Sequence, residues 1–341
     1  MSVLLIHGDA RQIPLGDQSI QCVVTSPPYW GLRDYETTGQ IGLEKTPEQY
    51  ISVMVEVFRE VRRVLRGDGT LWLNMGDSYC SPNGRSAGNL YTSSTLEIGA
   101  GTNKARNAPI AKTWDGPVRL KPKDLVGIPW MLAFALRSDG WYLRSDIIWS
   151  KPNPMPESCT DRPTKAHEYI FLLSKSEKYY YDADAIKEQV TGEAHARGNG
   201  INPKALSPVR GWAYGSSSHA AVDHNRATKH AGAGPKFKVK QNESFSGAVN
   251  ELVERRNKRS VWEIASQPFP ESHFATFPEE LIKPCILAGC AAGGTVLDPF
   301  IGSGTTALVA RNLQCNAVGL ELNPAYIEIA KKRLAQEVLA F

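Results

Sequence analysis

The stretch TVLDPFIGSGTTALVARNL, residues 295–313, places a short apolar run, a glycine-containing turn and a helical pattern in direct succession. The run 295–297 predicts a buried parallel strand, and 305–313 predicts a helix. Gly302 and Gly304 let a ligand approach the backbone of the turn closely, with the N-terminus of the helix facing that ligand. The stretch therefore predicts the ligand-binding strand, turn and helix of an α/β fold.

A carboxylate beyond this turn favours a nucleoside as the ligand. Glu321 lies 23 residues after Asp298, at the end of the next predicted strand, Ala317–Leu320. An acidic side chain in that place can accept hydrogen bonds from ribose hydroxyls. The third glycine of the dinucleotide fingerprint is missing and two threonines follow Gly304, which argues against NAD. Taken alone, the Gly-x-Gly turn is also compatible with a purely structural tight turn.

Strands alternate with helices at both ends of the chain. The other predicted strands are Val3–His7, Cys22–Thr25, Thr70–Met75, Asp146–Trp149 and Glu168–Leu173. The other predicted helices are Pro47–Leu65, which Gly67-Asp68-Gly69 should stop, Pro129–Leu136, Pro278–Ala288 and Pro324–Leu339. This alternation predicts a mostly parallel sheet with helices on both faces.

A second loop with unusual chemistry follows the strand that ends at Thr25. It consists of Ser26, Pro27, Pro28 and Tyr29. The prolines fix φ and supply no N–H, so the Pro27 carbonyl can point into a site beside the Ser26 hydroxyl. These two oxygens could accept both hydrogens of a nucleobase amine, whose lone pair is delocalised, while Tyr29 stacks on the base. The alternative is an ordinary proline turn.

Positive charge is concentrated in one segment. The chain has a formal net charge of +4, yet residues 185–262 carry 13 Lys and Arg against six Asp and Glu. Such a segment on an otherwise slightly acidic chain is typical of a region that binds a polyanion, and the alternative is a solvated insertion. A second irregular stretch, 81–117, is rich in Gly, Ser, Asn and Thr and predicts a long, mobile surface loop.

Together these motifs resemble the S-adenosylmethionine-dependent DNA amino-methyltransferases, the family that makes N4-methylcytosine or N6-methyladenine. In its permuted β subgroup the catalytic motif comes first, the target-recognition region follows and the cofactor motif comes last. Residues 69–79, 145–174 and 273–278 and the pair Gly8-Asp9 resemble further motifs of the family. The resemblance covers most of the chain outside the loop 81–117 and the basic segment.

The resemblance implies a circularly permuted class I methyltransferase fold, which is α/β with a Rossmann-like, mostly parallel sheet flanked by helices. Three parts are expected along the chain. Residues 1–184 would form the catalytic half, 185–262 an inserted irregular target-recognition region, and 263–341 the cofactor-binding half.

The resemblance also implies the residues of the site. The catalytic loop would comprise Ser26, Pro27, Pro28 and Tyr29. The S-adenosyl-L-methionine pocket would comprise Asp9, Asp298, Gly302, Gly304 and Glu321, with Phe300, Thr305 and Thr276 lining it. Asp9 is also compatible with a helix N-cap. His167 and Glu168 are equally compatible with structural strand residues and are assigned no catalytic role.

The expected reaction is direct methyl transfer to a base flipped out of duplex DNA, whose amine attacks the sulfonium methyl in line. In the family, Ser at the first catalytic position is associated mainly with N4-cytosine enzymes and Asp mainly with N6-adenine enzymes. Ser26 therefore favours cytosine, with adenine as the alternative. Cytosine C5-methylation needs a cysteine nucleophile after the cofactor motif. Cys285 precedes that motif inside a predicted helix and is interpreted as a core residue.

Three other classes of protein are compatible with parts of the sequence. A protein-glutamine methyltransferase has Asn before its Pro-Pro-Tyr loop and an earlier cofactor motif, neither of which is found here. A nucleotide-dependent oxidoreductase leaves the Ser26–Tyr29 loop unexplained. A non-catalytic DNA-binding protein accounts for the basic segment alone.

Composition predicts a cytoplasmic enzyme without a membrane segment, and the resemblance implies that its partner is double-stranded DNA. No apolar run approaches the roughly 18 residues needed to span a bilayer, and the first residues lack the pattern of a secretory signal. The six cysteines contain no Cys-x-x-Cys pair, so no metal site is expected. The sequence leaves open a homodimer and a cognate restriction endonuclease, which the reaction would not physically require.

Overall fold

The computed structural model describes residues 1–80, 120–189, 255–267 and 277–336. The chain divides into two compact units, Met1–Ile186 together with Arg259–Phe341, and Lys187–Lys258. The predicted loop 81–117 and most of the predicted target-recognition region lie outside the described residues. Of the second unit, the structure describes a short antiparallel pair, β6 (Glu188–Gln189) with β7 (Arg255–Arg256).

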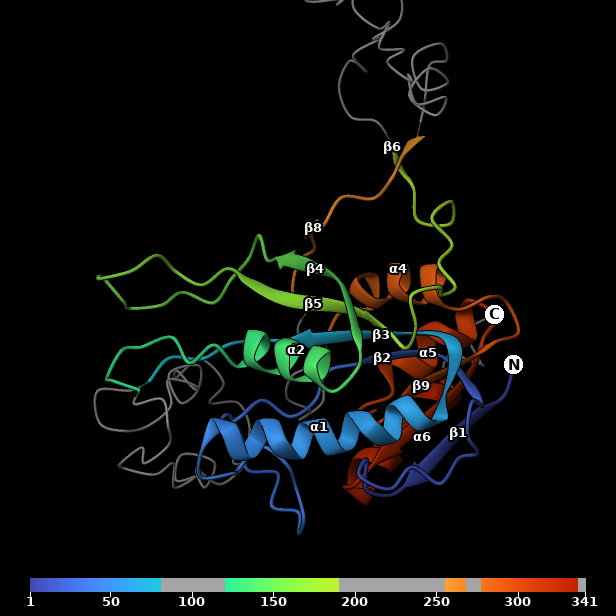
Figure 1. The fold of residues 1–341 in the computed structure, drawn as a ribbon, viewed down its shortest axis with the longest axis horizontal. Coiled ribbons are helices and arrows are strands. Elements are labelled where there is room, and N and C mark those ends of the chain that lie inside the picture. Colours follow the sequence, from blue (N-terminus) through green and yellow to red (C-terminus); the bar gives the residue numbers. More distant parts are fainter. Residues whose placement is uncertain (81–119, 190–254, 268–276, 337–341) are drawn as a thin grey trace, which may run out of the picture. The chain divides into compact units, whose positions relative to one another are not determined.

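The first unit is built on one eight-stranded sheet with the order β1-β10-β9-β2-β3-β5-β4-β8 (Figure 1). All of its strands run in one direction except β5, which is antiparallel to its neighbours β3 and β4. The predicted mostly parallel sheet is confirmed. The strands are β1 Val3–His7, β2 Ile20–Thr25, β3 Leu65–Met75, β4 Tyr142–Ser150, β5 His167–Ser174, β8 Val261–Glu263, β9 Thr295–Asp298 and β10 Asn316–Glu321.

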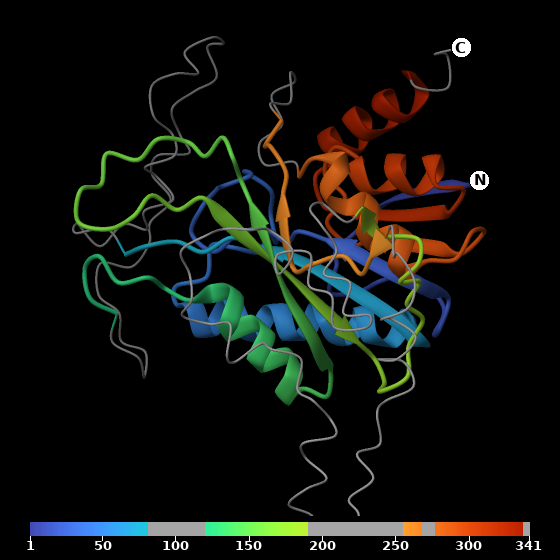
Figure 2. The ribbon, with the colours of Figure 1, turned by 90° about the horizontal axis from the view of Figure 1, so that it is seen from above.

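Helices cover both faces of this sheet. Because successive strand residues point to opposite faces, Val23 of β2 packs with α1 and α2, whereas Cys22 and Val24 pack with α4 and α5. In Figure 2 the orange and red helices α4, α5 and α6 gather at one end of the sheet and α2 lies at the other. The helices are α1 Pro47–Val64, α2 Ile128–Ser138, α4 Glu279–Gly289, α5 Thr305–Asn312 and α6 Pro324–Gln336.

The junction between α1 and β3 differs from the prediction. Thr46 caps α1, since its hydroxyl accepts the Gln49 N–H at 3.2 Å, and the helix ends at Val64, one residue before the predicted end. The glycines that follow do not separate helix from strand, because β3 begins at once with Leu65. The pairing with β2 jumps from Leu65 to Thr70, so the glycine-containing stretch forms an irregularity inside β3. The expected strand start at Thr70 was therefore wrong.

Two longer strands and one further strand extend the sheet beyond what the sequence indicated. β4 and β5 form an antiparallel pair that is longer than the predicted strands 146–149 and 168–173. β8 joins the outer edge of β4 in parallel, with Trp262 opposite Trp149. A strand of three residues is too short for a recognisable hydrophobic period. Residues 261–263 consequently belong to the first unit.

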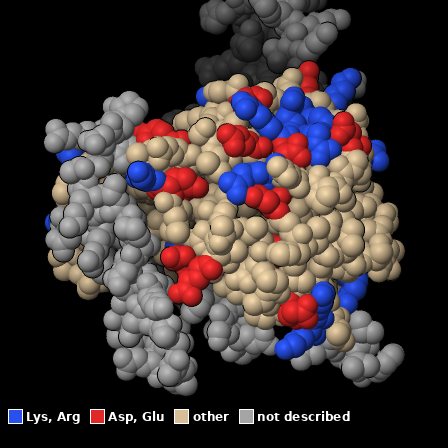
Figure 3. Space-filling view, turned by 90° about the horizontal axis from the view of Figure 1, so that it is seen from below, with Lys and Arg blue, Asp and Glu red and all other residues tan. Residues whose placement is uncertain are grey.

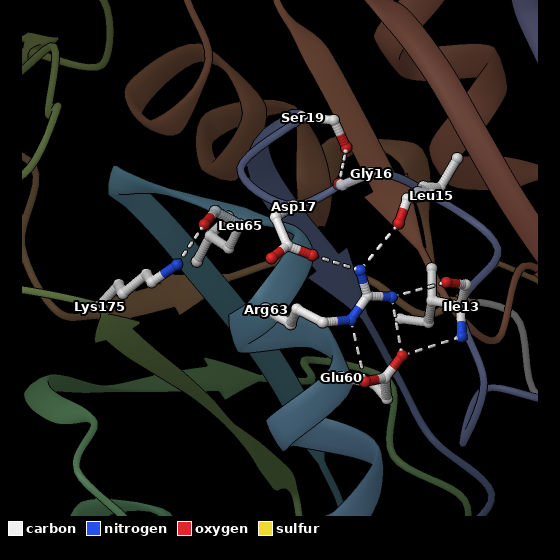
Figure 4. A network of polar contacts seen from close by, with 9 residues as sticks. All are labelled: Ile13, Leu15, Gly16, Asp17, Ser19, Glu60, Arg63, Leu65 and Lys175. Atoms are coloured by element: carbon white, nitrogen blue, oxygen red, sulfur yellow. Dashed lines mark hydrogen bonds and ion pairs between the residues drawn. The ribbon is translucent and has the colours of Figure 1, made fainter.

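A network centred on Arg63 connects α1 to the segment that leads into β2 (Figure 4). The guanidinium donates to the carbonyls of Leu15 and Ile13 at 2.9 and 2.8 Å and to Asp17 at 2.7 Å. Glu60, one turn earlier on α1, accepts from the same guanidinium at 2.8 Å. These bonds fix the path by which the chain enters β2, the strand that ends at the Ser26–Tyr29 loop.

On the face shown in Figure 3, Lys and Arg lie beside Asp and Glu instead of forming a patch of one sign. Arg59 of α1 pairs with Asp139 at 2.6 Å. Alternating charges of this kind do not make a surface that attracts a polyanion. None of the helices in the described part of the chain is long and apolar enough to cross a membrane.

Candidate active site

The two loops singled out in the sequence meet at the carboxyl edge of the parallel strands. β2 and β9 are neighbours, with Val23 opposite Leu297. Their last residues, Thr25 and Asp298, are joined by a hydrogen bond of 2.6 Å from Oγ1 to Oδ1. The loop that follows each strand therefore starts from the same point of the sheet.

Asp298 organises the glycine-containing loop from beneath. Its side chain is buried, and its carboxylate accepts the Phe300 N–H at 3.0 Å and the Thr306 hydroxyl at 2.6 Å, besides that of Thr25. Burial raises the pKa of Asp298 to about 6, although these hydrogen bonds act in the opposite direction. Asp298 thus shapes the loop through its own hydrogen bonds.

The loop itself presents backbone to the end of β10. Gly302 and Gly304 have φ of 51° and 88°, a region that favours glycine. Gly302 N–H donates to Glu321 Oε2 at 3.0 Å, and Asn323 N–H donates to Oε1 at 2.8 Å. Burial raises the pKa of Glu321. The predicted acid at the end of β10 therefore stands directly over the turn.

Thr305 and Phe300 support the loop. The Thr305 hydroxyl accepts from Arg333 of α6 at 2.7 Å, and Arg333 also pairs with Glu279 of α4. Phe300 packs against the apolar cluster on the α1 side of the sheet. These contacts hold the start of α5 in place beneath the turn.

Asp9 follows the end of β1, beside β10, where Gly8 N–H donates to the Glu321 carbonyl at 3.0 Å. Its carboxylate accepts the backbone N–H of Arg11 at 2.9 Å and pairs with the Arg11 guanidinium. Burial acts to raise the pKa of Asp9, but these bonds to Arg11 lower it below its usual range. Asp9 thus closes a local turn at the edge of the site. Thr276, the remaining predicted pocket residue, lies outside the described residues.

In the Ser26–Tyr29 loop the two proline carbonyls have different surroundings. Tyr50 of α1 donates its hydroxyl to the Pro28 carbonyl at 2.8 Å. Among the described residues, no donor reaches the Pro27 carbonyl. The Ser26 hydroxyl is half-buried and makes a long contact of 3.5 Å with the Tyr29 hydroxyl. α1 thus anchors the second proline and leaves the first carbonyl beside Ser26.

Tyr29 is held by residues of two strands, Asn74 of β3 and Glu168 of β5. Its hydroxyl donates to Glu168 Oε2 at 2.7 Å, and Asn74 Nδ2 donates to the same oxygen at 3.3 Å. The other oxygen of Glu168 accepts from Lys151 Nζ. Burial alone would raise the pKa of Glu168, but Lys151, Tyr29 and Asn74 lower it below its usual range. Burial also raises the pKa of Tyr29, so Glu168 is ionised and Tyr29 is protonated.

Sequence reasoning missed this group of Asn74, Lys151 and Glu168. The pair at 167–168 matched a family motif, but its residues lie far from Tyr29 in the chain. The available signal was an acid and a lysine at facing ends of two apolar strands, because an unpaired charge is costly there. No three or more His, Cys, Asp or Glu side chains within the described ranges are arranged to hold a metal ion.

The fold and these two loops define an α/β enzyme with the methyltransferase fold. The chain belongs to the DNA methylase family of N6- and N4-amino-methyltransferases, whose model matches residues 20–332. It is 44% identical over 335 residues to the type II methyltransferase M.SmaI of Serratia marcescens, covering 98% of this chain and 91% of that protein. M.Cfr9I of Citrobacter freundii, also a type II methyltransferase, is 43% identical over 337 residues, covering 98% and 88%. The predicted family is confirmed.

Two solved structures share the fold at lower identity. The cytosine-N4-specific PvuII DNA methyltransferase has a TM-score of 0.55 at 15% identity, covering 98% of this chain and 86% of that one. The putative DNA modification methylase TTHA0409 of Thermus thermophilus, complexed with S-adenosyl-L-methionine, has a TM-score of 0.54 at 22% identity, covering 100% and 96%. These likenesses confirm the predicted fold class.

Proposed function

We propose that the chain transfers a methyl group from S-adenosyl-L-methionine to the N4 amine of cytosine in double-stranded DNA. The observation that carries this proposal is the hydrogen bond between Thr25 and Asp298, which ties the Ser26–Tyr29 loop to the glycine-containing loop. A methyl donor bound at the glycine-containing loop would lie next to a methyl acceptor held at the Ser26–Tyr29 loop. Positioning of this kind is a major source of rate acceleration in group transfer.

The glycine-containing loop fits S-adenosyl-L-methionine. The positive φ of Gly302 and Gly304 shapes the turn at the N-terminal end of α5, where Gly302 is only half-buried and can face a ligand. The Glu321 carboxylate has about four lone-pair sites, and its hydrogen bonds to Gly302 and Asn323 leave acceptor capacity for a ribose hydroxyl. When bound, S-adenosyl-L-methionine supplies an electrophilic methyl on a sulfonium. Asp9 and Thr276 complete the proposed pocket.

The Ser26–Tyr29 loop would hold the amine that receives the methyl. The Ser26 hydroxyl and the Pro27 carbonyl accept its two hydrogens, which directs the nitrogen lone pair toward the donor. Because Tyr50 fixes the Pro28 carbonyl, the loop is set before the base enters. The base reaches these groups by flipping out of the duplex, and Tyr29 packs beside it.

Cytosine is favoured over adenine because Ser26 occupies the first catalytic position, as in the N4-cytosine members of the family. The PvuII enzyme, which is cytosine-N4-specific, has the same fold. Segment 185–262 is the proposed target-recognition region, since 13 of its residues are Lys or Arg. N6-adenine methylation with the same fold remains the alternative.

The test is to incubate purified protein with labelled S-adenosyl-L-methionine and plasmid DNA and to identify the methylated nucleoside by mass spectrometry. N4-methylcytosine is the expected product, and N6-methyladenine alone would replace the cytosine assignment by its alternative. The matched control is Ser26→Ala, which should abolish transfer while DNA binding is largely kept. Full methylation by that variant would refute the role of Ser26.

A further inference from the structure

We propose that Glu168 is a positioning residue that fixes Tyr29 in the target-base pocket, with Lys151 and Asn74 holding Glu168 in turn. This inference rests on the proposed function and concerns the same site. Glu168 lies at the start of β5, Lys151 directly follows β4, and Asn74 lies near the end of β3. Residues at the ends of three neighbouring strands thus form one hydrogen-bonded group, of which Glu168 and Asn74 contact Tyr29.

Each oxygen of the Glu168 carboxylate has a distinct partner. Oε1 accepts from Lys151 Nζ, which lies 4.2 Å from the centroid of the Trp149 ring. Oε2 accepts from the Tyr29 hydroxyl at 2.7 Å and from Asn74 Nδ2 at 3.3 Å. One oxygen of the Glu168 carboxylate is therefore held by Lys151, and the other binds the Tyr29 hydroxyl of the loop.

An ion pair that only stabilised the sheet would not need Tyr29. The Glu168 and Lys151 side chains are 17% and 21% exposed, so their mutual attraction is weakly screened by solvent and acts between these two charges alone. Instead, Glu168 also takes up the hydroxyl of a loop residue 139 positions away in the chain. This bond pins the outer end of the Tyr29 ring.

Glu168 is suited to hold Tyr29 and not to act as a base. The ammonium of Lys151 stabilises its ionised form, so it has little tendency to accept the proton that the amine loses. A charged acceptor forms a stronger hydrogen bond with a phenol than a neutral one does. With its hydroxyl held, the Tyr29 ring is oriented before the base arrives, which avoids an ordering cost during binding.

Ser26 also contacts the Tyr29 hydroxyl. Its hydroxyl lies 3.5 Å from the Tyr29 hydroxyl, so a change in the position of Tyr29 alters the surroundings of the amine acceptor. Glu168 should consequently affect turnover more than it affects binding of S-adenosyl-L-methionine, which involves the other loop.

The test is a double-mutant cycle with Glu168→Gln and Tyr29→Phe, measured as kcat for DNA methylation together with Kd for S-adenosyl-L-methionine. Glu168→Gln should lower kcat about 10- to 100-fold with unchanged Kd, because a charge-assisted hydrogen bond is lost. In the Tyr29→Phe background it should lower kcat by less than about two-fold, since the bond is already absent. Glu328→Gln, which removes an exposed ion pair with Lys331, is the control and should leave kcat unchanged.

The same cycle is also measured by urea unfolding, which does not depend on methylation. The two substitutions should be non-additive there as well. Additive effects on both kcat and unfolding would overturn the positioning role, even if the wild-type protein methylates DNA normally. Absence of any methyl transfer by the wild-type protein would instead overturn the proposed function, and the role of Glu168 in turnover with it.

Glu168→Asp is a second variant that tests the inference if Glu168→Gln does not fold. It keeps the negative charge beside Lys151 but shortens the side chain by one methylene, so the contacts of both oxygens cannot be kept together. We expect kcat to fall with Tyr29 present and to change little in the Tyr29→Phe background. An equal loss in both backgrounds would contradict the inference.

Discussion

Thr25 and Asp298, 273 residues apart in the chain, share a buried hydrogen bond of 2.6 Å. Thr25 is the last residue of β2 and Asp298 the last of β9, and these strands are neighbours in the sheet. Because a parallel sheet brings strand ends together whatever their order in the chain, the early loop and the late loop form one site. The permuted order is therefore compatible with a single active site.

Thr25→Val removes this hydrogen bond while nearly conserving volume. The Asp298 carboxylate loses one of its donors in a buried position, so the free energy of unfolding should fall by about 1–3 kcal/mol. Urea unfolding measures this difference. Thr295→Val, the same substitution at the start of β9, is the matched control and should lower the free energy of unfolding much less. Equal losses of unfolding free energy in the two variants would show that the hydrogen bond between Thr25 and Asp298 does not add to stability.

Asp298 should make stability depend on pH. Burial raises its pKa from 3.8 to about 6, so the folded state holds this proton more tightly than the unfolded state does. The resulting stabilisation is complete below pH 3.8 and is lost as the pH rises through about 6.

This dependence is read by comparing wild type with Asp298→Asn, which cannot ionise. Between pH 5 and pH 7.5 the wild-type free energy of unfolding should fall by about 1 kcal/mol relative to that of the variant. Urea unfolding at both pH values checks this. A constant difference between the two proteins would contradict a raised pKa at Asp298.

Most of the sheet and its helices could be predicted because their apolar periods are long or strongly β-branched. The irregular stretch in β3 could not be predicted, because Gly67 and Gly69 are equally typical of the end of a helix. The structure shows another reason for Gly69: a Cβ there would lie 2.6 Å from the Leu65 side chain. Close packing and turn formation both require glycine, and sequence alone does not separate them.

The residues of the site also differ in how well the sequence predicts them. Ser26, Gly302 and Glu321 belong to compact local patterns, and each lies at the predicted edge of the sheet. Glu168 acts through contacts with Tyr29 and Lys151, which depend on the register of β4 against β5. Register is a property of the assembled sheet, so no local pattern contains it. The sequence therefore left the role of Glu168 open, since a structural strand residue was equally compatible with it.

Asp77 should stabilise the start of α2. Its carboxylate accepts the N–H groups of Gly127 at 2.9 Å and Ile128 at 3.2 Å, two donors that the helix leaves unsatisfied. Asp77→Ala is expected to lower the free energy of unfolding by about 1–2 kcal/mol, as for other helix caps. Asp77→Asn, which retains an acceptor oxygen, should lose less. Urea unfolding distinguishes them, and equal stability of all three proteins would rule out the cap.

Gly76→Ala should displace Tyr29 while leaving unchanged the side chains that bind its hydroxyl, Glu168 and Asn74. A Cβ at Gly76 would lie 2.6 Å from Tyr29 Cε2 and 3.3 Å from Cδ2, so the ring must move. If Tyr29 positions the target base, kcat should fall about 10- to 100-fold, because small displacements in a preorganised site are costly. Binding of S-adenosyl-L-methionine should be unchanged, since the glycine-containing loop is not affected.

Gly67→Ala is the matched control for this experiment. A Cβ at Gly67 would meet nothing within 4 Å, so the same substitution inside β3 introduces no clash. Steady-state methylation assays and calorimetric titration of S-adenosyl-L-methionine compare the two variants with wild type. A Gly76→Ala protein that retains wild-type kcat would mean that the orientation of the Tyr29 ring does not govern turnover. Loss of kcat in both variants would point to β3 as a whole.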